Sequence, residues 1–103
     1  MSIEKRTQAL IDLDDLAAHL TIHAGQDVAF RFLNAAEKTL ERIAAMPASG
    51  ALFEFNDPRL AGIRHATVRG FPNHYLFYLE RPGGIELVRV LHAKRDLDSV
   101  LSG

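Results

Sequence analysis

The chain has 103 residues, of which 48% are apolar, so it can bury one modest core and is not disordered throughout. It contains no cysteine, which excludes disulfide bonds, thiolate metal sites and a cysteine nucleophile. Its formal net charge is −1, from 12 Lys and Arg against 13 Asp and Glu, and neither half of the chain is strongly charged. Proteins that bind nucleic acids usually carry a dense basic stripe, which this composition does not predict.

The N-terminus has no apolar segment typical of a signal peptide, and no run approaches the roughly 20 apolar residues of a membrane span. We therefore expect a cytoplasmic protein. The length predicts a single domain over residues 1–103, without room for separate catalytic and binding domains.

The first half of the chain has helical periodicity. A first helix is predicted from apolar residues at helical spacing, namely Leu10, Leu13, Leu16, Ala17 and Leu20. We expect Asp12, Asp14 and Asp15 to lie in its early turns, where acids favour the helix dipole. Ala24-Gly25 is a stop signal, and a second helix then runs from Gln26-Asp27 to about Met46, before Pro47. Its apolar stripe consists of Val28, Phe32, Leu33, Ala36, Leu40 and Ile43.

The segment Pro47–Leu60 is rich in Pro, Gly, Ser, Asn and Asp, which predicts a connecting segment within the domain. Phe53 and Phe55 lie in it. Exposed aromatic side chains are costly, so we expect both to pack on the core rather than to contact a ligand.

The second half predicts three strands, at Ile63–Gly70, Tyr75–Glu80 and Ile85–Leu91. The middle one is apolar on both faces, as expected of a central strand. Phe71-Pro72-Asn73-His74 and Arg81-Pro82-Gly83-Gly84 are predicted as the turns between them. A first strand around Ile3–Thr7 and a terminal helical turn after Asp96 are also possible.

These elements define an α+β fold, in which an N-terminal helical hairpin packs on a C-terminal three- to four-stranded antiparallel sheet. The short connection between the helices makes them antiparallel neighbours. The two helices need an apolar surface to cover, and the sheet provides it.

No phosphate loop, dinucleotide fingerprint or zinc-protease motif is present, so we expect no cofactor. His19 and His23 lie four residues apart on the first helix, a spacing that can bind a metal. A third ligand is not evident, however, so a solvated or capping role is the expected one, and no metal site is predicted.

Four arginines fall on or beside the predicted strands: Arg64, Arg69, Arg89 and Arg95. Because a guanidinium is unfavourable in a core, each must reach solvent, a carboxylate or a partner. We regard all four as candidates for binding a partner or target through carboxylate or phosphate contacts. Ion pairing within the sheet is the simpler alternative.

His92 ends the run Val88–His92 and is either a hydrogen-bonded histidine at a strand end or a general acid or base. Residues three apart on a regular strand point to opposite faces. Arg89 and His92 can therefore share a site only if a bulge or a strand end intervenes.

The sequence resembles toxins of the ParE/RelE superfamily, and the ParE branch most. The resemblance rests on Ile63-Arg64, on Arg69-Gly70-Phe71 before Tyr75-Leu76-Phe77-Tyr78, and on the segment from Ile85 to Leu97. In the helical half, Asp12–Leu16 and Arg31-Phe32-Leu33 also fit. The short, polar N-terminus departs from the family, which usually has a clear first strand.

This resemblance implies the toxin of a type II toxin–antitoxin system, neutralised by a small cognate antitoxin. Characterised ParE toxins poison DNA gyrase, whereas RelE-like members cleave mRNA on the ribosome. We favour a gyrase-directed, non-enzymatic toxin that does not bind DNA directly when alone. The alternatives are an mRNA interferase with Arg69, Arg89 and His92 in its site, or a degenerate member that retains only antitoxin binding.

Overall fold

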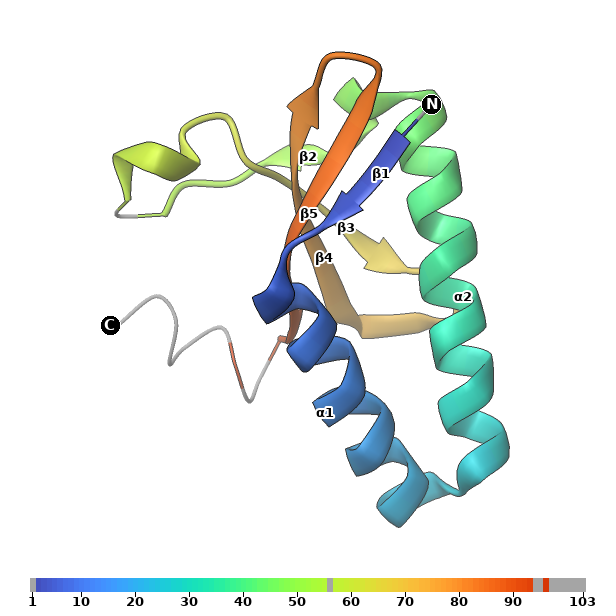
Figure 1. The fold of residues 1–103 in the computed structure, drawn as a ribbon. Coiled ribbons are helices and arrows are strands. Elements are labelled where there is room, and N and C mark those ends of the chain that lie inside the picture. Colours follow the sequence, from blue (N-terminus) through green and yellow to red (C-terminus); the bar gives the residue numbers. More distant parts are fainter. Residues whose placement is uncertain (1, 56, 94–95, 97–103) are drawn as a thin grey trace.

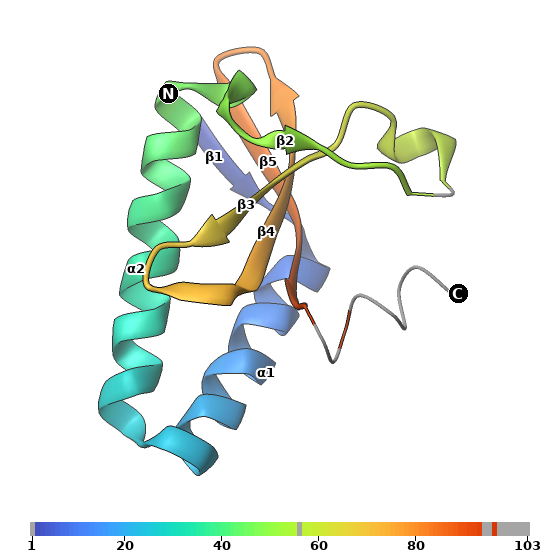
Figure 2. The ribbon, with the colours of Figure 1, turned by 180° about the vertical axis from the view of Figure 1, so that it is seen from behind.

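A computed structural model of the protein describes residues 2–55, 57–93 and 96. Two helices cover one face of a five-stranded sheet, and a loop covers part of the other face (Figures 1 and 2). The helices are α1 (Thr7–Ala24) and α2 (Gln26–Ala45). The strands are β1 (Ser2–Lys5), β2 (Ala51–Leu52), β3 (Arg64–Val68), β4 (Phe71–Arg81) and β5 (Gly84–His92). The predicted helical hairpin is confirmed.

The sheet is larger than predicted and is mixed rather than antiparallel. Its strand order is β1-β5-β4-β3-β2. Strands β2 to β5 pair antiparallel, but β1 pairs parallel with β5, with Ile3 opposite Ile85. The helices α1 and α2 separate β1 from the other strands in the chain, and β1 lies at the outer edge of β5.

One predicted turn is wrong. Phe71–His74 is the beginning of β4, and the chain reverses one step earlier, at Arg69-Gly70. Gly70 has φ +83°, a conformation that glycine adopts readily and that lets the turn close there. The Arg81–Gly84 turn lies where it was predicted.

The main core lies between the helices and the sheet. Phe32, Ala36, Leu40 and Ile43 of the predicted α2 stripe are buried in it, although Val28 is only half-buried. On α1, Leu13 and Leu16 are buried and Leu10 is exposed. The sheet contributes Val68, Leu76, Tyr78, Ile85, Leu87 and Val90.

A smaller core lies on the opposite face of the sheet. It consists of Ile63, Phe77, Leu79, Val88 and Leu91. Phe53 and Phe55, from the loop before β3, pack against this core, as predicted. β4 is therefore buried on both faces and is the central strand.

Asp12, Asp14 and Asp15 do not lie in the first turn of α1, because that helix begins at Thr7. The expected interaction of these three acids with the helix dipole is therefore not supported. None of the helices in the described part of the chain has the length and apolar character needed to cross a membrane.

Candidate functional site

The four predicted arginines do not converge on one site. Arg64 is held within the fold, where its Nε donates to Glu80 at 3.1 Å and its guanidinium donates to the Gly50 carbonyl at 2.7 Å. The simpler alternative, ion pairing along the sheet, therefore describes Arg64. Arg95 lies outside the described residues.

Arg89 is bound by a carboxylate of α1. Its Nε donates to Asp12 Oδ2 at 2.8 Å, and its Nη2 donates to Asp12 Oδ1 at 3.2 Å. The Val90 amide donates to the same Oδ2 at 3.0 Å. Asp12 is 8% exposed, so this carboxylate is buried and fully engaged.

The position of Asp12 follows from the edge of β5. β1 pairs with β5 only as far as Leu87, whose carbonyl accepts a hydrogen bond from the Arg6 amide. Beyond that point no strand within the described residues pairs with the outer edge of β5, and an unpaired buried amide is costly. The Asp12 carboxylate satisfies the Val90 amide in place of a strand.

A β-bulge in β5 determines which way the Arg89 side chain projects from the sheet. The β4–β5 register shifts between Phe77 and Tyr78, which oppose Arg89 and Leu87, so Val88 is the extra residue. Arg89 lies between two grooves of about 620 and 470 Å³. The larger is polar and lies along α1, with Asp15, His19 and Asp96 in its lining. The smaller lies beneath the loop at Asp57–Leu60.

His92 lies on the other side of the sheet from Arg89. His92 pairs with His74, and the two rings meet edge to face at 5.1 Å. His74 is buried against Phe32, which belongs to the core under the helices. The bulge precedes Arg89 and does not separate it from His92. The two side chains therefore point to opposite faces of the sheet, as predicted for residues three apart on a regular strand.

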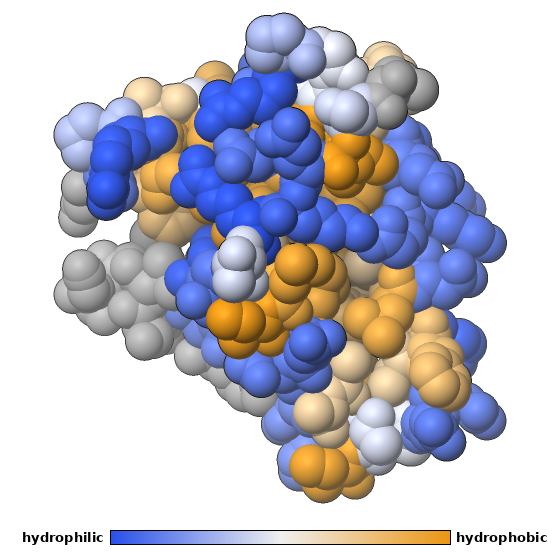
Figure 3. Space-filling model, viewed as in Figure 1, coloured by the Kyte–Doolittle hydropathy of each residue, from blue (hydrophilic) through white to orange (hydrophobic). Residues whose placement is uncertain are grey.

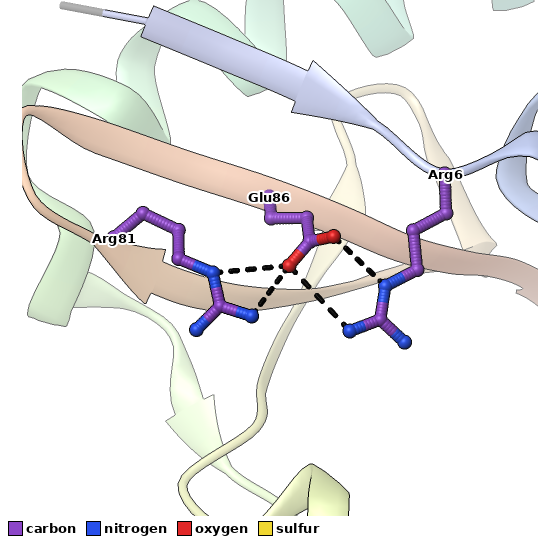
Figure 4. A network of polar contacts seen from close by, with 3 residues as sticks. All are labelled: Arg6, Arg81 and Glu86. Carbon is purple, nitrogen blue, oxygen red and sulfur yellow. Dashed lines mark hydrogen bonds and ion pairs between the residues drawn. The ribbon is translucent and has the colours of Figure 1, made fainter.

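Glu86 is the centre of a second polar cluster, on the strand segment before the bulge. It accepts hydrogen bonds from Arg6 at 2.9 Å and from Arg81 at 2.6 Å (Figure 4). These hydrogen bonds, of which the one from Arg6 has the largest effect, hold the pKa of Glu86 below its ordinary value. Burial acts in the opposite direction. The cluster joins the β1–α1 junction to the β4–β5 hairpin.

An aromatic group lies on the face of the sheet opposite the helices. His65 packs edge to face against Phe53 and Tyr75, with ring centroids 5.4 Å apart in both contacts. Burial in this group lowers the pKa of His65, so its neutral form is favoured. This face is thus a packed aromatic surface, on which His65 pairs with no carboxylate of the described residues.

Arg69 lies in the turn between β3 and β4, and its side chain lines a groove beside α2. Arg69, Arg89 and His92 therefore lie at three different places. General acid–base catalysis needs its groups within hydrogen-bonding reach of one reacting atom. No such grouping of these three residues is present.

The rings of His19 and His23 contact each other at a tilt of 39°, with centroids 4.2 Å apart. The described residues contain no group of three side chains suited to hold a metal ion.

Sequence analysis did not predict Asp12 as the partner of Arg89, although a signal was present. Asp12 falls on the same helical stripe as Ala9, Leu13 and Leu16, all of which are buried. An acid on a buried stripe requires a cation or amide partner. The pairing of Glu86 with Arg6 had no comparable signal, since 80 residues separate the two.

Comparison with solved structures supports the fold. A chain described as the chromosomal ParDE TA system from P. aeruginosa matches with a TM-score of 0.73, over 91% of this chain and 97% of that one. The two sequences are 18% identical, so this likeness concerns the architecture. No match is found among curated proteins.

A family model described as the ParE toxin of the type II toxin–antitoxin system parDE matches residues 3–97. The protein therefore belongs to the ParE family of type II toxins, as its sequence resemblance indicated.

Proposed function

We propose that this ParE-family toxin inhibits DNA gyrase by binding it, and that it does not cleave RNA. The observation that carries this proposal is the engagement of Arg89. Its Nε and one terminal nitrogen donate to Asp12, and the same carboxylate is fixed by the Val90 amide. Freeing Arg89 for catalysis would leave a buried carboxylate without its cation.

The separation of Arg89 from His92 also supports a non-nucleolytic toxin. A ribonuclease needs a base at the attacking hydroxyl and a cation at the phosphate, within about 3 Å of the reacting atoms. His92 and Arg89 are on opposite faces of the sheet, and Arg69 is beside α2. A protein that acts by binding has no such requirement.

Neutralisation by a cognate antitoxin is the second part of the proposal. Large apolar side chains are exposed on the helical hairpin, among them Leu10, Ile11, Ile22 and Phe30. Exposed apolar groups of this size favour a partner surface, and an amphipathic helix is a suitable partner. Figure 3 shows apolar residues gathered over α1 and near the tip of the hairpin.

The antitoxin is tested by co-expression with the product of the neighbouring short open reading frame and purification through a tag on the toxin. We expect the two proteins to co-purify. Phe30→Asp should weaken the complex, whereas Met46→Asp, at a similarly exposed residue directly after the C-terminal end of α2, should not. Failure of the wild-type proteins to co-purify would contradict this part.

The target is tested with purified toxin in two parallel assays. We expect inhibition of gyrase supercoiling and no cleavage of ribosome-bound mRNA. Codon-dependent cleavage without gyrase inhibition would replace this proposal with the interferase alternative. Antitoxin binding with neither activity would indicate the degenerate alternative.

A further inference from the structure

A basic groove runs between α2 and the β3–β4 turn. Its volume is about 300 Å³, and its lining consists of Arg31, Asn34, Ala35, Lys38, Arg42 and Arg69. Four of these six residues are cations and none is an acid. We call these four, Arg31, Lys38, Arg42 and Arg69, the groove cations.

Among the described lysines and arginines, the groove cations differ from the others in forming no ion pair with an acid. The structure describes ten Lys and Arg side chains. Six form ion pairs: Lys5, Arg6, Arg59, Arg64, Arg81 and Arg89. The four that pair with no described carboxylate are the groove cations. The unneutralised positive charge of the described chain is therefore concentrated in one place, despite the net charge of −1.

Three of the groove cations share one stripe of α2. Arg31, Lys38 and Arg42 are spaced by seven and four residues, so they project from the same side of the helix. At about 1.5 Å per residue they span roughly 16 Å. Lys38 and Arg42, four apart, repel each other in the free protein. A bound anion would relieve that repulsion.

The fourth cation is brought to this stripe by the fold. The turn that carries Arg69 is attached to α2 by a hydrogen bond from the Arg69 amide to Thr39 Oγ1, at 3.3 Å. The Thr39 hydroxyl, which is buried, donates in turn to the Ala35 carbonyl at 2.7 Å. Both ribbon views show the turn reaching α2 (Figures 1 and 2).

The lining also indicates the kind of ligand. Ala35 is the only apolar residue among the described residues that line it, and the rest of its walls consist of polar and cationic side chains with their aliphatic stems. None of its described lining residues is aromatic, so they offer no ring on which an unstacked base could lie, as single-stranded nucleic acids usually require. Three guanidinium groups, which bind phosphate through paired hydrogen bonds, favour a phosphate backbone.

From these observations we infer that the groove cations bind the phosphate backbone of duplex DNA, without sequence specificity. This goes beyond the action on gyrase and does not depend on it. It also differs from our expectation that the toxin alone does not bind DNA. That expectation rested on the net charge, which conceals this local concentration of unpaired cations.

The inference is tested without gyrase, by measuring how tightly the full chain binds a labelled DNA duplex of about 20 base pairs. Fluorescence anisotropy measures the binding at several salt concentrations. Four phosphate contacts predict a slope of about −3.6 for log K against log salt. Arg42→Gln and Arg31→Gln should each make the slope shallower by about 0.9.

Arg59→Gln is the matched control, because it removes the same charge from an exposed cation that is already paired with Asp57. It should leave the slope unchanged. Equal slopes for Arg42→Gln and Arg59→Gln would overturn the inference, as would no measurable binding at low salt. Duplex RNA, single-stranded DNA and polyglutamate are compared in the same assay. Tighter binding of any of these three would overturn the assignment to duplex DNA.

Discussion

The carboxylate of Asp12 on α1 binds both the side chain of Arg89 and, through the Val90 amide, the backbone of β5. One buried side chain thus attaches the first helix to the sheet where β1 has ended. The contact joins residues more than 75 positions apart, so it forms only when the whole fold is in place. It also neutralises the arginine that an RNA-cleaving site would use.

We expect Asp12→Ala to lower the free energy of unfolding by about 3–5 kcal/mol, because it leaves the Arg89 charge and the Val90 amide without a partner. Urea denaturation measures this loss. Asp14→Ala, at an exposed position on the same helix, is the control and should change stability by less than about 0.5 kcal/mol. If the two variants are equally stable, Asp12 is not a structural partner of β5.

The helices and the central strand could be predicted because their signals are local. The α2 stripe has a strict helical period, and Tyr75–Glu80 is apolar on both faces. β1 was harder to predict, because Ser2–Lys5 is short and polar and its partner is β5, some 80 residues away. The Pro72-Asn73 pair suits a turn, but Gly70 accommodates the positive φ, so the reversal occurs at Arg69-Gly70 and Pro72 lies in the strand.

Truncation of the second helix's core residue tests the main packing interface. Leu40 is fully buried among side chains of the helices and the sheet. Leu40→Ala should cost about 2–5 kcal/mol of unfolding free energy, from lost burial and the cavity left behind. Leu10→Ala, at a position 47% exposed, is the control and should cost well under 1 kcal/mol. A loss below about 1 kcal/mol for Leu40→Ala would mean that this face is not the core.

The stability of the protein should fall on acidification partly through Glu86. Its pKa lies below the ordinary 4.5 in the folded state, because Arg6 and Arg81 bind the carboxylate. A lowered folded pKa stabilises the fold fully above about pH 4.5, and this stabilisation is lost as the pH falls through the folded value. We expect urea denaturation to show that Glu86→Gln is less stable than wild type at pH 7, and that the difference shrinks toward pH 3.

Asp57 provides the comparison, because its pKa is also lowered by a neighbouring arginine, Arg59, but the pair is exposed. Asp57→Asn should change the pH profile less than Glu86→Gln does, since solvent screens exposed pairs. A difference between wild type and Glu86→Gln that is constant from pH 7 to pH 3 would show that the carboxylate titrates alike in both states.

The candidate site could be predicted only in part. The arginines required partners, and two of them, Arg64 and Arg89, have carboxylate partners within the fold. Their partners could not be named, because ion pairs between distant segments leave no periodic signal. Of the groove cations only Arg69 was predicted as a binding residue, and Arg31, Lys38 and Arg42 were missed for a related reason. Their shared property is that none of them forms an ion pair with a described acid, which only the arrangement of α2 and the β3–β4 turn reveals.

Replacement of His92 separates the two targets most directly. If the toxin acts on gyrase, His92→Ala should affect supercoiling inhibition only as far as it affects folding, because His92 packs against His74 on the helix side of the sheet. If it were a general acid or base of an interferase, the same change would reduce mRNA cleavage by about 10²–10⁴-fold.

His23→Ala, at an exposed histidine of α1, is the control variant. Wild type, His92→Ala and His23→Ala are first compared by circular dichroism to measure how much of each protein is folded. We expect all three proteins to leave ribosome-bound mRNA intact and to inhibit gyrase in proportion to their folded fraction. Cleavage by wild type and His23→Ala that disappears in folded His92→Ala would instead establish His92 as a catalytic residue.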